Sequence, residues 1–388
     1  MYDDDDDIES HGKRPDGYAE AGHPASMSED SILEVDSVGF DLEDELAADE
    51  VFDKKVPTWV KVLIVVGLVL VFLVSFCIGR YGISLPEVFS TVWNHFFDPD
   101  AITDENMERS LFNVRLPRIL VVMIVGAGLS VAGASYQGMF KNPLTSPDLL
   151  GASAGASLGA GIAIIAGFPN IIVQLMAFVG GLVAVGCAVG LTRLVKYDAI
   201  LSLVLAGILV SSLFNAGMSL IKLLADSNSR LPELTYWLMG SFNDVNANDL
   251  LLLLLPAAIA FIILLSQAWK LNVLSFGDEE ARSMGINTSR TRLLVILAST
   301  LLTSISVSVA GVIGWVGLVI PHLARAIVGP NYKVLLPTSM AFGAAFLTLV
   351  DDVARNLMAV EVPIGILTAI LGVPFFVVIF KNNMKGWS

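Results

Sequence analysis

The sequence predicts an all-α polytopic membrane protein, and three observations support that fold class. Hydrophobic residues make up 55% of the 388 residues and charged residues only 15%, whereas soluble proteins carry about a quarter charged residues. The mean hydropathy is +0.72. Apolar runs of about 18 residues or more recur along the chain, and each is long enough to cross a hydrocarbon core of roughly 30 Å. A single buried core would not need so many full-length runs.

We expect about ten transmembrane helices. They lie near residues 58–78, 116–139, 149–167, 171–192, 199–222, 249–268, 292–310, 313–329, 334–353 and 362–380. Pro57 suits the first turn of the first helix, where a missing N–H is tolerated. The small residues of Gly151–Gly167 favour close packing of helix backbones, with a pore wall as the alternative interpretation.

The distribution of Lys and Arg predicts the direction of the chain, because cytoplasmic loops of membrane proteins are enriched in both. With the N-terminus placed in the cytoplasm, the inner side carries fourteen Lys and Arg residues and the outer side seven. Ten spans then place the C-terminus in the cytoplasm as well. The opposite orientation would reverse this ratio.

An acidic segment, residues 1–56, precedes the first span and holds most of the net charge of −14. It includes "DDDDD" at Asp3–Asp7 and "DLEDELAADE" at Asp41–Glu50. A polar, acidic segment with few aromatic residues predicts a disordered cytoplasmic tail, and a specific docking arm is the alternative. Cys77 and Cys187 both fall in apolar runs, so we expect small core residues without a disulfide or metal role.

Two segments of the chain resemble each other. "RILVVMIVGAGLSVAGASYQGMFKNPL" begins at Arg118, and "RLLVILASTLLTSISVSVAGVIGWVGL" begins at Arg292. Each is an Arg followed by an apolar helix that ends in small residues and a glycine-rich bend, and the two are expected to run in opposite directions. Inverted repeats of this kind are typical of transporters.

Enzymatic motifs are absent from the sequence. No Gly-x-x-x-x-Gly-Lys-Ser/Thr phosphate loop occurs, so the chain is not expected to hydrolyse ATP by itself. No His-Glu-x-x-His or Gly-x-Ser-x-Gly motif occurs either. His322 lies in a span beside Pro321, which makes it a candidate functional residue. We favour a hydrogen bond to a backbone carbonyl freed by the proline over a ligand role, and we expect no metal site.

A polar segment, "SFGDEEARSMGI" at Ser275–Ile286, interrupts two long apolar runs on the predicted cytoplasmic side. Gly277 and Gly285 bracket one or two helical turns. Asp278, Glu279 and Glu280 fall in the first turn, where the helix dipole favours negative charge. Ala281 and Met284 are expected to form a small apolar face. Taken alone, these residues are equally compatible with an ordinary loop helix.

Arg115 and Arg118 lie on the predicted outer side, against the charge bias, at the start of a helix that Pro117 begins. The helix dipole disfavours positive charge at that position, and sites that break local rules are often functional. Arg355, in "DDVAR", is a third candidate on that side. Asp351 lies four residues earlier, so an ion pair on one helix face is the alternative for Arg355.

Several stretches together resemble one family. They are "RLPRILVVMIVGAGLSVAGASYQGMFKNPLTSPDLLGASAGA" from Arg115, "SFGDEEARSMGI" from Ser275, "GVIGWVGLVIPHLAR" from Gly311 and "DDVARNLMAVEVPIGILTAILGVPFF" from Asp351. They resemble the FecCD-type permeases of ABC importers for iron-siderophores, haem and cobalamin. The resemblance covers residues 57–385, and the acidic tail departs from it. It implies a permease domain over residues 57–388, following the tail.

The resemblance also implies site residues and partners. A coupling segment near residues 270–291 would insert into a groove of a separate ATPase subunit, using Gly277, Asp278, Glu279, Glu280, Ala281, Met284 and Gly285. Arg115, Arg118 and Arg355 would receive glutamates of an external substrate-binding protein. A second copy or a sister permease would complete the channel. ATP and Mg²⁺ would bind to the partner ATPase, this chain would hold no cofactor, and no nucleic acid would be involved.

The function expected from this resemblance is the import of a metal chelate, an iron-siderophore in particular, across the bacterial cytoplasmic membrane. The sequence leaves open which chelate is moved and whether the dimer has one kind of chain or two. An ion-coupled secondary transporter is the alternative, but it requires mid-membrane carboxylates that are scarce here. An intramembrane enzyme lacks a catalytic set.

Overall fold

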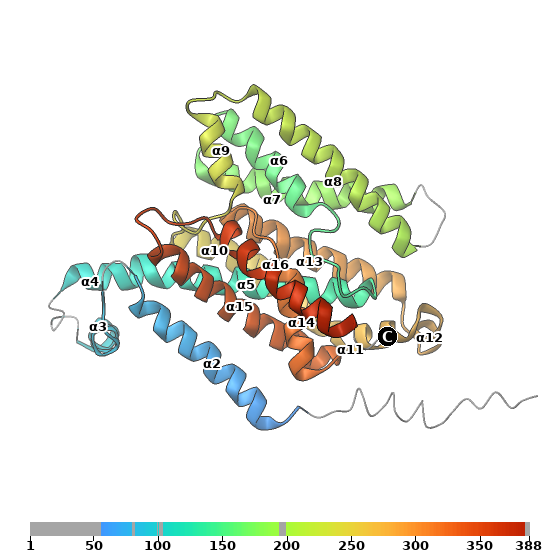
Figure 1. Cartoon of the computed structure of the whole chain (residues 1–388), viewed down its shortest axis with the longest axis horizontal. Coiled ribbons are helices and arrows are strands. Elements are labelled where there is room, and N and C mark those ends of the chain that lie inside the picture. Colours follow the sequence, from blue (N-terminus) through green and yellow to red (C-terminus); the bar gives the residue numbers. More distant parts are fainter. Residues whose placement is uncertain (1–55, 80–81, 99, 101–103, 194–198, 385–388) are drawn as a thin grey trace, which may run out of the picture. The chain divides into compact units, whose positions relative to one another are not determined.

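The computed structural model describes residues 56–79, 82–98, 100, 104–193 and 199–384 (Figure 1). All regular elements in these ranges are helices, which confirms the predicted fold class. The predicted acidic tail lies outside the described residues, except for Val56. Its predicted disorder therefore stays a prediction.

Ten apolar helices in the described ranges match the ten predicted spans. They are α2 (Thr58–Cys77), α5 (Leu116–Met139), α6 (Ala152–Ile165), α7 (Asn170–Thr192), α8 (Ala199–Leu224), α10 (Ala247–Ser266), α13 (Thr288–Ala310), α14 (Val316–Val328), α15 (Tyr332–Asn356) and α16 (Ile364–Met384). Seven of these ten helices are long and apolar enough to cross a membrane. The other three, α6, α14 and the apolar part of α16, are shorter.

One short helix, α12 (Asp278–Ser283), is the one that the sequence predicted between Gly277 and Gly285. Five further elements were not predicted as separate helices. They are α3 (Leu85–Phe97), α4 (Glu105–Arg109), the π-helical segment η3 (Ser110–Arg115), α9 (Arg230–Leu238) and α11 (Ala268–Phe276). Each is short, and most mix polar with apolar residues, so a search for long apolar runs does not detect them. Segments α4, η3 and α5 run on without a break from Glu105 to Met139.

Helices α5 and α13 form the centre of the bundle. In α5, 83% of the most apolar stretch is buried inside the protein, compared with 11% in α2. The first half of α5 packs with the last part of α13, through Val121, Val125 and Ile305. The last part of α5 packs with the first half of α13, through Met139 and Val295. The two helices are therefore antiparallel, with α2 at the periphery.

The same series of helices occurs twice along the chain. Helices α5 to α8 contain 24, 14, 23 and 26 residues, and helices α13 to α16 contain 23, 13, 25 and 21. Each series is a long helix, a short helix and two long helices. Because α5 and α13 are antiparallel, this arrangement agrees with the predicted inverted repeat.

Glycines allow the central backbones to touch. A Cβ added at Gly133 of α5 would lie 1.8 Å from the carbonyl oxygen of Gly317 in α14. A Cβ added at Gly155 of α6 would lie 2.3 Å from the carbonyl oxygen of Gly180 in α7. The glycines of the 151–167 segment thus serve close helix packing, which is the interpretation that the sequence favoured.

The functional elements lie at the two ends of the bundle (Figure 1). One end holds α3, α4 and α9, together with the start of α5 and the ends of α2 and α15. The other end holds α11 and α12, where Asn272 of α11 accepts a hydrogen bond from the backbone N–H of Tyr332 at the start of α15. We name these the outer end and the inner end, following the direction predicted from Lys and Arg.

Candidate functional site: the inner-end helices and the outer-end charge network

The inner end carries the short helix that the sequence predicted between two glycines. Gly277, with φ of +154°, separates α11 from α12, and Gly285, with φ of +79°, follows α12. All three residues of the first turn, Asp278 to Glu280, are acidic. Asn287 then begins α13 by accepting a hydrogen bond from the backbone N–H of Arg290 at 2.9 Å. The local signals in the sequence are therefore realised in the structure.

Two contacts fix α12 to the rest of the protein. The Asp278 carboxylate accepts a hydrogen bond from Nη2 of Arg292, in the first turns of α13, at 2.5 Å. Ala281 is completely buried in the core cluster that also contains Leu271, Leu274 and Ile286. The expectation that Ala281 forms part of an exposed apolar face is wrong, because its side chain packs inward and anchors the helix.

The side chains that α11 and α12 leave exposed form a compact surface. Phe276 and Met284 are half exposed, and Glu279, Glu280 and Arg282 lie exposed beside them. We call these five residues the inner knob. Phe276 was not singled out from the sequence, although a large apolar side chain directly before a glycine in a cytoplasmic loop was a usable signal. An apolar centre with a rim of two glutamates and one arginine, which is net acidic, suits a groove with a mainly basic rim.

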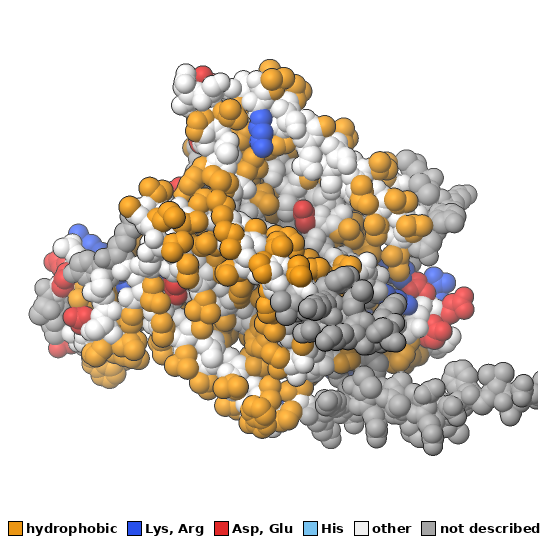
Figure 2. Space-filling model, in the orientation of Figure 1, with side chains coloured by type: hydrophobic (Ala, Val, Ile, Leu, Met, Phe, Trp, Pro, Cys, Tyr) orange, Lys and Arg blue, Asp and Glu red, His pale blue; other side chains and the backbone are white. Residues whose placement is uncertain are grey.

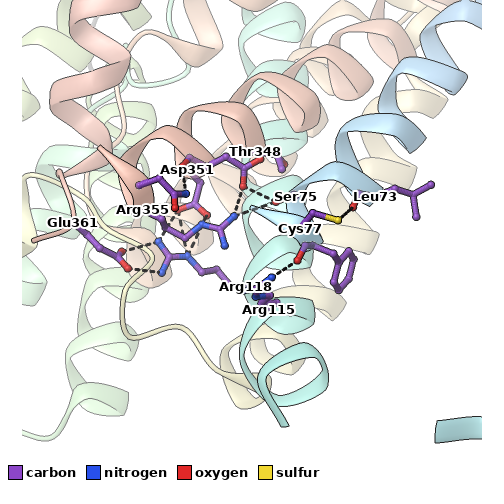
Figure 3. A network of polar contacts seen from close by, with 12 residues as sticks. Leu73, Ser75, Cys77, Arg115, Arg118, Thr348, Asp351, Arg355 and Glu361 are labelled. Carbon is purple, nitrogen blue, oxygen red and sulfur yellow. Dashed lines mark hydrogen bonds and ion pairs between the residues drawn. The ribbon is translucent and has the colours of Figure 1, made fainter. Parts of the chain in front are cut away.

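The outer end carries a network of buried charges around Arg118 (Figure 3). Nη2 of Arg118 donates to Oδ1 of Asp351 at 2.7 Å, and Nε donates to Oδ2 of Asp351 at 3.1 Å. Nη2 also donates to Oε2 of Glu361 at 2.8 Å. The start of α5 is thereby bound to the last turns of α15 and to the segment that follows α15.

Arg355 extends the network from α15 to α2. Nε of Arg355 lies 3.1 Å from Oδ2 of Asp351, and Nη2 pairs with Asp352. Nη2 also donates to Oγ of Ser75 at 3.1 Å, and Ser75 donates to Asp352 at 2.7 Å. The predicted alternative for Arg355, an ion pair with Asp351, is confirmed.

Arg115 completes the network beside α2. It ends the π-helical segment η3 and donates to the carbonyl oxygen of Phe76 in the last turn of α2. Single π-helical turns within α-helices are frequent at functional sites. The structure thus brings the three predicted arginines together at one end of the bundle, around the contact of α2, α5 and α15.

The network is neutral and buried. Arg118 and Arg355 pair with the carboxylates of Asp351, Asp352 and Glu361, and Arg115 contacts the carbonyl oxygen of Phe76. The three arginines and three carboxylates carry no net charge, and all except Glu361 are almost inaccessible. The side chain of Glu361 is 16% exposed. In this structure the arginines have partners within the chain, and their predicted capture of glutamates from another protein stays a prediction. Buried charges require internal partners, and here they have them.

The exposed charges at the outer end are mostly acidic. Among the described residues, the exposed acidic side chains are Glu87, Asp98, Asp100, Glu105, Asp226, Glu233 and Asp244, against the exposed side chains of Arg109, Lys222 and Arg230. A hollow of about 360 Å³ opens beside α9, lined in part by Glu233, Asp244 and Asp249 and by no Lys or Arg. The described surface of this end is thus mainly negative, because the three arginines that the sequence singled out are buried.

The remaining candidates lie elsewhere. His322 is partly buried in α14, next to Pro321, and its predicted hydrogen bond to a carbonyl stays a prediction. Cys77 and Cys187 are both free thiols. Cys187 is exposed on the isolated chain, so the expectation of a core position is wrong for this cysteine. Among the described residues, no group of three His, Cys, Asp or Glu side chains is placed to hold a metal ion.

Comparison with known proteins decides the family. The sequence profile of the FecCD transport family matches residues 67–382. The chain belongs to this family. It is 38% identical over 322 residues to the molybdate import system permease protein MolB of Haemophilus influenzae, covering 83% of this chain and 95% of MolB. It is 35% identical over 316 residues to a probable iron chelatin transport system permease protein of Helicobacter pylori, covering 81% of this chain and 95% of that protein.

The fold also matches a solved member of this class. A metal-chelate type ABC transporter in an inward-facing conformation superimposes with a TM-score of 0.76 and 37% sequence identity, covering 84% of this chain and all of the other. The FecCD protein described here is therefore a multi-pass inner-membrane permease of the ABC transporter class, the membrane component of a transporter whose ATPase is a separate subunit.

Proposed function

We propose that this FecCD permease imports a metal chelate, an iron-siderophore complex, in an assembly driven by a separate ATPase. The observation that carries the proposal is the inner knob, an exposed apolar and acidic surface on two short helices that are anchored to the core. A secondary transporter has no need of such a surface. The absence of a phosphate loop from the sequence agrees with ATP binding on a partner chain.

The anchoring of α12 provides a route from the ATPase to the membrane helices. Asp278 ties α12 to Arg292 of α13, and Ala281 packs into the same core cluster as the inner-end halves of α5 and α13. A force on Phe276 or Met284 is therefore passed to the two central helices. Closure of the ATPase subunits on ATP would shift the population between inward-open and outward-open arrangements of these helices.

The choice of an iron chelate rests on the relatives and on the charge of the outer end. The H. pylori relative is described as an iron chelatin permease and the solved structure as a metal-chelate type transporter. MolB is described as a molybdate permease, and molybdate is a small oxyanion. An outer surface on which exposed carboxylates outnumber exposed Lys and Arg disfavours a free oxyanion, because like charges repel.

Docking of an external substrate-binding protein would take place at the outer end, by exchange of partners. Carboxylates of the binding protein can reach Arg118 only by replacing Glu361 or Asp351. Glu361 is the member of the network nearest to solvent, so it would be replaced first. A second copy of this chain, or a sister permease, would complete the channel.

Cysteine cross-linking tests the proposed contact with the ATPase. In a protein with Cys77 and Cys187 replaced, Phe276→Cys and Met284→Cys should each cross-link to the co-expressed ATPase through a short bismaleimide. Leu223→Cys is the matched control, because Leu223 is highly exposed in the last turn of α8 towards the outer end. Equal cross-linking from all three positions, or from none, would contradict the contact.

The substrate class is tested with the same purified assembly. Uptake of radiolabelled ferric siderophore into proteoliposomes should exceed uptake of radiolabelled molybdate when each is supplied with the external binding protein that docks on this permease. Preferential uptake of molybdate would reject the iron chelate and leave the contact with the ATPase standing.

A further inference from the structure

Helix α3 exposes an apolar face that no other described element covers. Leu85, Phe89, Trp93, Phe96 and Phe97 are between 42% and 69% exposed. Their spacing of four, four, three and one residues places them on one side of a helix with 3.6 residues per turn. The rings of Trp93 and Phe97 stack at 4.4 Å. In Figure 2, hydrophobic side chains gather where Figure 1 places α3.

The other sides of α3 are of different character. Val88 and Thr91 are buried against the rest of the protein. Glu87, Ser90 and Asn94 lie on a third, polar side. The helix has 13 residues, about 20 Å at 1.5 Å per residue, which is too short to cross a hydrocarbon core of roughly 30 Å. A helix with separate buried, polar and aromatic sides is not a transmembrane span.

The helix is held firmly at the level where α2 ends. It begins at Leu85, eight positions after the last residue of α2, and a capping box fixes its first turn, with Glu87 accepting from the backbone N–H of Ser84 at 2.7 Å. At the other end, Nδ1 of His95 lies 2.5 Å from Oε1 of Glu108, and the His95 ring stacks on Phe112 at 4.0 Å. These contacts set the direction in which the aromatic side points.

We propose that α3 lies in the outer membrane–water interface, with its aromatic side inserted into the lipid. Trp and other amphipathic aromatic residues are favoured at this level of a bilayer. An amphipathic helix in the interface buries its apolar side by about 5–10 Å. The hydrophobic side chains of α3 and those of the lipid-facing helix α2 lie towards the same side of Figure 2, so one lipid surface can cover both.

A lipid surface fits this face better than a protein partner does. The aromatic side of α3 carries no charged residue. The exposed charges at the outer end lie on other elements or on the polar side of α3. Phe76 and Ile119, beside the arginine network, share a core cluster with Val88 of α3. An interfacial α3 would therefore hold the outer-end network at a fixed height above the membrane.

Quenching of Trp93 fluorescence by lipid-borne bromine tests this proposal. The chain has six tryptophans, so the Trp93 signal is taken as the difference between the wild type and Trp93→Phe in nanodiscs. We expect phosphatidylcholine brominated near the glycerol end of its acyl chains to quench most of this signal. Bromine near the chain ends should quench it less, and aqueous iodide should have little effect. Trp237→Phe, in α9, provides the control.

The opposite pattern would overturn the proposal. If the Trp93 signal is quenched by iodide and not by brominated lipid, α3 faces water. If it is then shielded from iodide only when the external binding protein is added, the aromatic side is a protein-docking surface. Trp93 is 62% exposed, so Trp93→Phe leaves no buried cavity and a failure to fold does not obscure the result.

Discussion

Asp351→Asn removes the carboxylate at the centre of the outer-end network. Asp351 contacts both Arg118, at 2.7 Å, and Arg355, at 3.1 Å, and its side chain is 1% exposed. The substitution leaves a net positive charge among buried groups. Removal of one partner from a buried ion pair costs about 3–5 kcal/mol, which lowers the folding equilibrium constant by about two to four orders of magnitude.

The chain contains a matched control for this prediction. Glu105 also precedes an arginine by four residues, and its carboxylate lies 3.1 Å from Nη2 of Arg109, but its side chain is 76% exposed. An exposed pair with this spacing contributes only about 0.3–0.5 kcal/mol. Glu105→Gln should therefore leave stability almost unchanged.

Reversible unfolding in mixed bicelles, started by a denaturing detergent, measures both variants against the wild type. Hydrogen exchange should locate the effect of Asp351→Asn in the last turns of α15 and the first turn of α5. Similar small losses for Asp351→Asn and Glu105→Gln would refute the reasoning, because burial would then not distinguish the two pairs.

Three further predictions concern separate elements. Gly133→Ala should lower the free energy of unfolding by about 1–3 kcal/mol, because the new methyl group forces α5 away from α14. Gly67→Ala in α2 should leave it unchanged, because no atom lies within 4 Å of the added Cβ. Equal thermal stability of the two variants would contradict this. Met284→Ala should keep the fold but reduce co-purification of the ATPase, and Leu223→Ala should not. Hydrogen bonds from the backbone and side chain of Ser84 lower the pKa of Glu87 in the folded protein. The ionised Glu87 therefore stabilises α3 at any pH above the pKa that Glu87 has in the unfolded chain. This stabilisation is lost as the pH falls through the pKa of Glu87 in the folded protein. Hydrogen exchange in the first turn of α3 should accelerate over that range in the wild type, and Glu87→Gln should remove the pH dependence.

The transmembrane helices could be predicted from the sequence because their signal is local. An apolar run of 20 residues, such as Thr58–Cys77, is visible without knowledge of its neighbours. The same is true of α12, whose limits are set by Gly277 and Gly285. Helix α3 was missed because it is short and exposes aromatic residues that alternate with polar ones.

The environment of the arginines could not be predicted, because it depends on distant parts of the chain. Asp351 and Glu361 follow Arg118 by 233 and 243 residues. Without the fold, Arg118 resembles a free charge at a helix start. Ala281 presents the same difficulty at the inner end, since a small apolar residue in a polar loop can face either a partner or the core. Only the packing of α12 shows that it faces the core.

The energy source of transport tests the central claim most directly. Proteoliposomes containing this permease and its ATPase are loaded with ATP and supplied with external binding protein and radiolabelled ferric siderophore. The account predicts uptake that requires ATP in the lumen, persists when ionophores collapse all ion gradients, and falls when Met284 is replaced by Ala. Uptake without ATP that ionophores abolish would contradict the account and identify an ion-coupled secondary transporter.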